Sequence, residues 1–233
     1  MWLREFANKG YFVTVNSHLN PKIWQGNELD PAVAQKLMKI AATFERFIGI
    51  DLPVEDYTVT GSNANYSWTK FSDLDLHIIV KGAVTDEQRE LFNAKKALWS
   101  EHHNITIKGI PVECYVQGES EPHHSTGIYS IKSNSWIETP KKIKPKLDTA
   151  AVQAKLDSMV HDIEAAIASG SQDKIEHVKD RITSMRKAGL ERTGEWSTEN
   201  QVFKKLRTLG LIDKLSEKIR ELEDRELSLE SKT

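Results

Sequence analysis

Residues 61–80 read GSNANYSWTKFSDLDLHIIV and contain the pattern from which the core of the fold is predicted. A Gly-Ser turn is followed after nine residues by Ser-Asp-Leu-Asp and then by an apolar run, which predicts a buried strand over residues 74–80. Side chains two positions apart in a strand share one face. Asp73 and Asp75 are therefore predicted to project together, while Leu74 and Leu76 point into the core.

This pair of carboxylates predicts a divalent-metal site. Two carboxylates held close together repel each other unless a cation lies between them, and hard oxygen ligands suit Mg²⁺. Nucleotidyl transfer uses a pair of such ions about 3.5–4 Å apart. We therefore expect two Mg²⁺ ions, with Mn²⁺ as a substitute, and a third acidic ligand on a neighbouring strand. Glu113, in the strand-like run IPVECYV, is the candidate, because Glu101 and Glu119 lie outside such runs.

The Gly-Ser turn is the candidate phosphate-binding element. Gly61 allows the backbone to approach a phosphate closely, and Ser62 adds a hydroxyl and an amide. Ser72, directly before Asp73, completes the predicted nucleotide-binding residues. The alternative for the aspartates is an exposed strand edge that only aids solubility.

Sequence patterns outside this stretch predict an α/β (α+β) core that extends over residues 1–140. We expect a short extended segment at 11–15, a helix that starts at Pro31 and ends at Gly49, and a strand at 57–60. A second helix is expected over 86–100, with Leu91, Ala94 and Leu98 facing inward, followed by a hairpin over 105–116 that turns at Lys108 and Gly109.

A helical domain is predicted over residues 147–233. Residues 117–146 lose the periodic pattern and end in a lysine-rich run, so the domain junction is placed there. Apolar stripes at 152–167 and 175–185 predict two helices, the first ending at Gly170. A third is expected to start at the Ser197/Thr198 cap and to continue past Gly210.

Composition fits a soluble, cytoplasmic protein. The chain has 233 residues, 39% hydrophobic and 28% charged, and a net charge of −2. One cysteine excludes an intramolecular disulfide, and no apolar run approaches the roughly 20 residues that cross a bilayer. The first ten residues lack a secretory signal pattern.

Several weaker candidates have an alternative structural explanation. Lys70 is either a phosphate ligand or a solvated loop lysine, and His77 either supports the aspartates or is an ordinary sheet histidine. Tyr129 and Trp136 either stack on a base or pack a domain interface. The His102-His103 and His123-His124 pairs have no third ligand at zinc spacing. A local excess of basic residues between Arg181 and Arg207 either binds a triphosphate or RNA backbone or is a solvated helical face.

Together, Gly61, Ser62, Asp73, Asp75 and Glu113 resemble the signature of the nucleotidyltransferase superfamily, which includes DNA polymerase beta, CCA-adding enzymes, aminoglycoside nucleotidyltransferases and oligoadenylate synthases. The resemblance covers residues 30–117. Within the superfamily, the chain is similar to small members encoded by phages or bacteria. It implies a mixed sheet flanked by helices, two Mg²⁺ ions and an NTP donor such as ATP. Residues 63–71 lack the Arg-Gly pair common in CCA-adding and minimal antibiotic-modifying members.

The expected activity is transfer of a nucleoside monophosphate from an NTP to a hydroxyl, with release of pyrophosphate. The sequence does not identify the acceptor, which is an RNA end, a protein, a nucleotide or a small molecule. Two alternatives stay open: a catalytically silent NTP- or RNA-binding module, and an interaction protein such as one half of a toxin–antitoxin pair.

Overall fold

The computed structural model describes residues 15–122, 125–142 and 147–229. Contacts between residues divide the chain into two compact units, with described residues 15–142 in one and 147–229 in the other. Most of the extended segment expected at 11–15, and the pair His123-His124, lie outside the described residues. The two units are described separately below.

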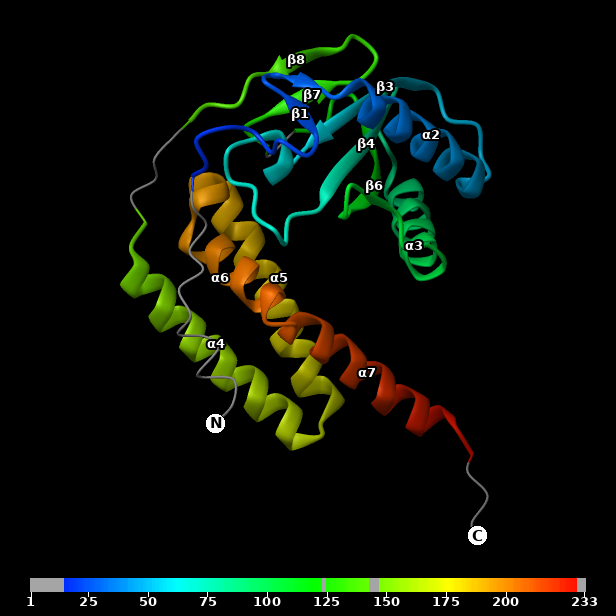
Figure 1. Cartoon of the computed structure of the whole chain (residues 1–233). Coiled ribbons are helices and arrows are strands. Elements are labelled where there is room, and N and C mark those ends of the chain that lie inside the picture. The colour runs from blue at the N-terminus through cyan, green and yellow to red at the C-terminus, as the bar shows by residue number, and fades with distance from the viewer. Residues whose placement is uncertain (1–14, 123–124, 143–146, 230–233) are drawn as a thin grey trace. The chain divides into compact units, whose positions relative to one another are not determined.

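The first unit contains a mixed six-stranded sheet (Figure 1). The strand order is β5-β6-β4-β3-β7-β8. Only the β4–β6 pair of this sheet is parallel among the described residues, and its other pairs are antiparallel. The strand bounds are β3 Val54–Thr60, β4 Leu74–Val80, β5 Thr106–Ile107, β6 Ile110–Gly118, β7 Ile128–Ser130 and β8 Ser135–Glu138, and a separate hairpin joins β1 Trp24–Gln25 to β2 Glu28–Leu29. The predicted fold class, a mixed-sheet α/β unit followed by helices, is confirmed.

The stretch expected to loosen after residue 117 contributes two strands to this sheet. β7 pairs with β3 through Thr58–Ser130 and Val59–Tyr129, and β8 pairs with β7. Each strand is too short to show a periodic pattern, and the tight turn between them carries Asn134 at φ 52°. Pairing of β7 with β3 and of β8 with β7, rather than local periodicity, defines these strands.

Helix α2 (Pro31–Ile48) forms as predicted. The Asp30 side chain accepts hydrogen bonds from the Ala32 and Val33 amides, and Gly49 ends the helix in the left-handed region at φ 83°. Its buried stripe, which repeats at helical spacing, is Val33, Leu37, Ile40, Ala41, Phe44 and Ile48. This stripe packs in one core with the apolar side of β4, so α2 supports the strand that carries the aspartates.

Helix α3 (Asp86–His102) forms, but the predicted inward face was wrong. Leu91 and Leu98 are exposed, as is Ala94, and the buried residues are Phe92 and Trp99. The rings of Phe44 and Trp99 meet at 5.4 Å, so the larger aromatic side chains determined the rotation of the helix. This rotation matters for the site, because it directs Lys96 toward β6.

The predicted hairpin turn at Lys108 and Gly109 is confirmed. Both residues have positive φ, 49° and 79°, as a two-residue hairpin turn requires. The hairpin joins β5 to β6, and β6 then continues alongside β4 in parallel register (Figure 1).

The second unit consists of four described helices rather than the predicted three. They are α4 Thr149–Ser169, α5 Gln172–Thr193, α6 Thr198–Thr208 and α7 Leu211–Leu227. Gly210 adopts φ 68° and separates α6 from α7. The segment therefore forms two helices, although its apolar pattern continues across the glycine. The expected stripes of α4 and α5 are largely buried in a core of their own, together with Leu206 and Leu215.

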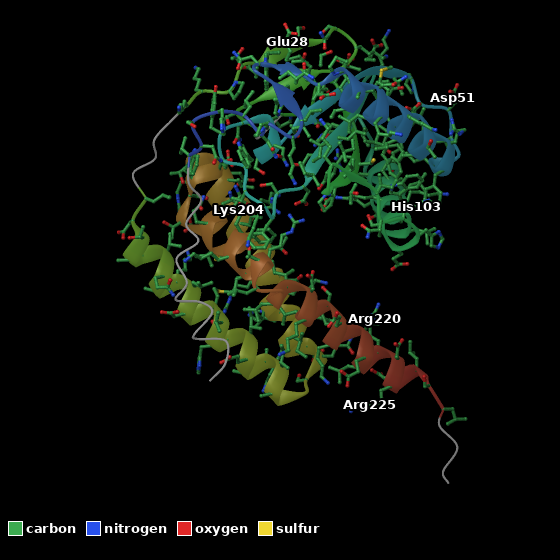
Figure 2. The ribbon with its side chains drawn as sticks, viewed as in Figure 1. Glu28, Asp51, His103, Lys204, Arg220 and Arg225 are labelled. Atoms are coloured by element: carbon green, nitrogen blue, oxygen red, sulfur yellow. The ribbon has the colours of Figure 1, made fainter. Side chains whose placement is uncertain are left out.

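The outer face of α7 is charged, with Arg220 and Arg225 exposed (Figure 2). Among the described residues, no helix combines the length and the apolar character needed to cross a membrane.

Candidate active site

The structure brings the three predicted acidic residues together. Asp75 on β4 is the direct register partner of Glu113 on β6, and Asp73 lies two residues before Asp75. Leu74 and Leu76 are fully buried on the opposite face of the strand. Period-two alternation therefore places the acidic side chains on one side of two adjacent strands, as the sequence predicted.

Gly61 lies directly against the Asp75 carboxylate. The turn begins where β3 ends, and Thr60 pairs with Asp75 across the β3–β4 ladder. A Cβ atom added to Gly61 would lie 1.8 Å from Oδ2 of Asp75. Gly61 also has φ 72° and ψ −161°, a region that is essentially restricted to glycine. Both the contact and the backbone conformation therefore require glycine at this position.

The predicted nucleotide-binding serines contact each other. Ser62 Oγ donates a hydrogen bond to Ser72 Oγ over 2.8 Å, and the Thr69 amide donates to the same Ser72 oxygen over 2.9 Å. These bonds close the nine-residue loop, so the Gly-Ser turn lies beside the start of β4.

Asn63, which the sequence analysis missed, fixes this turn to the strand. Its amide Nδ2 donates to the Asp73 carbonyl over 2.7 Å, while its own carbonyl oxygens accept from Asn20 Nδ2 and Trp24 Nε1. Asn63 is fully buried, so these hydrogen bonds satisfy polar groups that water does not reach. A buried asparagine within a loop has no periodic signature, which explains why the sequence did not single it out.

One oxygen of the Glu113 carboxylate accepts two hydrogen bonds. Tyr115 Oη donates to Glu113 Oε2 over 2.6 Å, and Lys96 Nζ of α3 donates to the same oxygen over 2.9 Å. Tyr115 lies two residues after Glu113 on β6, so period two predicts that it shares that face. Lys96 reaches the site from another element, and only the observed rotation of α3 places it there.

These neighbours determine the protonation of the site. Burial would raise the pKa of Glu113, but a hydrogen bond with the Asp73 carboxyl, the Lys96 charge and the Tyr115 hydroxyl together lower it below its usual value. Burial raises the pKa of Tyr115, and the charges of Asp75 and Glu113 raise it further, so its hydroxyl stays protonated and donates. Glu113 is therefore held as a carboxylate.

His77 belongs to the same face of the sheet. Its Nδ1 lies 2.7 Å from Oε1 of Gln117, and its ring stacks on Tyr115 at 4.8 Å between centroids. The histidine is thus hydrogen-bonded within the sheet, and it packs against the tyrosine that donates to Glu113.

A cavity of about 220 Å³ adjoins this face at the edge of β6. Lys96 and Tyr115, both bonded to Glu113, form part of its wall, together with Asn93 and Gln117. Arg89 and Glu121 also line it and are paired through two hydrogen bonds of 2.9 and 3.2 Å.

The donor set fits Mg²⁺ by chemistry, because hard carboxylate oxygens are the ligands this ion prefers. Within residues 15–122, 125–142 and 147–229, however, no three His, Cys, Asp or Glu side chains are already arranged to hold a metal ion. Glu113 directs one oxygen to Lys96 and Tyr115 instead. Metal binding would therefore require a rearrangement of side chains.

The weaker candidate residues from the sequence make contacts within the fold of the first unit. Tyr129 is buried in the first unit between Trp24 and Trp136, with all three rings within 5.0 Å of one another, so it packs a core rather than being available to a base. The Lys70 ammonium lies over the Phe71 ring. His103, of the first histidine pair, packs against Trp99.

Part of the basic excess of the second unit is paired with acidic residues. Arg192 and Lys155 both contact Glu199, and Lys204 contacts Glu195. Arg181 pairs with Asp162, and Arg186 lies over the Phe203 ring. These contacts favour a structural role for the basic residues they involve.

Comparisons with known proteins give little further information. No protein-family model matches the chain, and no curated protein matches it either. Among solved structures, the chain is similar to a STING-associated CdnE c-di-GMP synthase from Capnocytophaga granulosa, with 15% identity over 85% of this chain and 83% of that one and a TM-score of 0.24. A likeness this low does not identify a function.

Proposed function

We propose that the chain is a metal-dependent nucleotidyltransferase, which transfers a nucleoside monophosphate from an NTP to a hydroxyl acceptor and releases pyrophosphate. One observation carries the proposal. Asp75 and Glu113 are register partners on adjacent parallel strands, Asp73 hydrogen-bonds Glu113, and the Gly61 backbone lies against the Asp75 carboxylate. Three acidic residues and a glycine turn thus share one site.

Asp73, Asp75 and Glu113 would hold the metal. Bound Mg²⁺ would supply charge neutralisation for the triphosphate and would lower the pKa of the acceptor hydroxyl. The Asp73 and Glu113 carboxyls contact each other, so a cation bound between them would relieve the repulsion of two neighbouring negative charges.

Gly61, Ser62 and Ser72 would orient the triphosphate. A phosphate can approach the backbone at Gly61 because no side chain stands there, and the Ser72 hydroxyl, which accepts from Ser62, keeps its own O–H to donate beside it. Asn63 would keep this turn at a fixed distance from Asp73 through its bond to the Asp73 carbonyl. Positioning of this kind accounts for much of the catalysis in phosphoryl transfer.

The test measures pyrophosphate release by the full chain with each of the four NTPs and Mg²⁺ or Mn²⁺, with products identified by mass spectrometry. We expect release with at least one NTP and its loss in the Asp73→Asn/Asp75→Asn variant. Glu138→Gln is the matched control, because it removes a carboxylate from an exposed position on β8 of the same unit. It should retain activity.

Two results would contradict the proposal. NTP binding without pyrophosphate release under every condition would favour a catalytically silent module. Equal release by the parent chain and the double aspartate variant would place the chemistry elsewhere.

A further inference from the structure

The contact between Lys96 and Glu113 has a consequence for metal binding. The Lys96 ammonium lies 2.9 Å from Glu113 Oε2 and 3.5 Å from the centre of the Tyr115 ring. It is therefore held from two sides, by a carboxylate and by an aromatic face, and both kinds of contact stabilise a cation. A positive charge already occupies the acidic site.

The same oxygen cannot serve Lys96 and a divalent cation together. Glu113 Oε2 accepts from both Tyr115 and Lys96, which uses its lone pairs in the plane of the carboxylate. An ammonium within a few ångströms of a divalent cation would also repel it strongly in this half-buried setting. Lys96 therefore competes with the metal for Oε2 of Glu113, and its charge opposes a divalent cation bound to the other oxygen, Oε1.

The surrounding structure gives Lys96 a place to move. Lys96 lines the 220 Å³ cavity at the β6 edge, whose wall includes the polar side chains of Asn93 and Gln117. Its side chain is partly exposed, at 24%. This opening is where the Lys96 side chain would move when it releases Glu113.

We infer that Lys96 is a positioning residue that binds Glu113 and is displaced when a divalent cation binds, so that it sets the metal affinity of the site. This inference rests on the proposed function.

The experiment measures Mn²⁺ binding by the full chain from the electron paramagnetic resonance signal of free Mn²⁺. Lys96→Met, which keeps the length of the side chain and removes its charge, is expected to lower the Kd for Mn²⁺ at least tenfold. Lys96→Arg, which keeps the charge, should bind no more tightly than the parent chain. The matched control is Lys95→Met, since Lys95 bonds the Phe47 carbonyl instead and should leave the Kd unchanged.

Adding Asp75→Asn to Lys96→Met separates this inference from the proposed function. If the parent chain binds Mn²⁺ through Asp75 and Lys96→Met leaves the Kd unchanged or raises it, the inference is overturned while the proposed function stands. If neither the parent chain nor the Lys96→Met variant binds Mn²⁺, or if Asp75→Asn leaves the Kd for Mn²⁺ unchanged, the inference and the proposed function are both overturned. Lys96→Gln replaces the methionine variant if circular dichroism shows that the latter does not fold.

Discussion

Replacement of Gly61 by alanine tests whether the turn and Asp75 act as one unit. The new Cβ would lie 1.8 Å from Asp75 Oδ2, whereas real Cβ contacts are not shorter than 3.0 Å, so the carboxylate must retreat by at least about 1 Å. A displacement of about 1 Å in a catalytic group typically costs about 100-fold in rate. The backbone conformation adds strain of about 1–3 kcal/mol to the folded state, because alanine rarely adopts it.

Gly49→Ala separates strain from displacement. Gly49 also has positive φ, 83°, yet an added Cβ there meets nothing within 4 Å. It should cost about 1–2 kcal/mol in stability and leave activity unchanged. Urea unfolding followed by circular dichroism measures the first quantity, and pyrophosphate release from the preferred NTP measures the second.

The expected result is therefore similar destabilisation by both alanines and a loss of activity of about 100-fold only at position 61. If Gly61→Ala keeps a rate within a few-fold of Gly49→Ala, the contact with Asp75 has no part in the chemistry. Such a result would remove the main support for a phosphate-binding turn at this position.

Three further predictions concern stability. Gly127→Ala would place a Cβ 2.0 Å from the backbone oxygen of Ala64, which cannot rotate away, so it should lower the free energy of unfolding in urea by about 1–3 kcal/mol or more. Leu206→Ala removes a fully buried side chain from the helical unit and should cost about 2–5 kcal/mol, whereas Leu227→Ala at an 84% exposed position should change stability by less than about 0.5 kcal/mol. Equal effects of the two leucine variants would contradict the assigned core. The Lys155 and Arg192 side chains lower the pKa of Glu199 from 4.5 to about 2, so its carboxylate stabilises the fold fully above pH 4.5 and loses this effect as the pH falls toward 2. Glu199→Gln should therefore lower the urea midpoint at pH 7 but lose most of this difference near pH 2, and a difference that is constant with pH would contradict the assigned ion pairs.

Local patterns predicted much of the fold and the site. Helix α2 and the strand with Asp73 and Asp75 follow from helical spacing and from period-two alternation, which depend only on backbone geometry. Glu113 was predicted because an acidic residue within a strand-like run is unusual, and the β4–β6 register places it opposite Asp75. The Lys108-Gly109 turn was predicted because these two residues separate two strand-like runs, and both adopt the positive φ of a hairpin turn.

Long-range contacts decided the features that the sequence did not predict. The inward face of α3 depends on Trp99 meeting Phe44, and β7 and β8 depend on pairing that starts from β3. Asn63 and Lys96 acquire their roles from partners many residues away or on another element.

Local sequence patterns thus establish that Asp73 and Asp75 share a face and where the glycine turn lies, because both follow from the dihedral angles and periods of single segments. The contacts of Lys96 with Glu113 and of Asp75 with Gly61 are settled only by the packed fold. Each of these contacts requires separate elements to pack in one register and rotation. That arrangement depends on the volumes of side chains throughout the core, and no single segment encodes it.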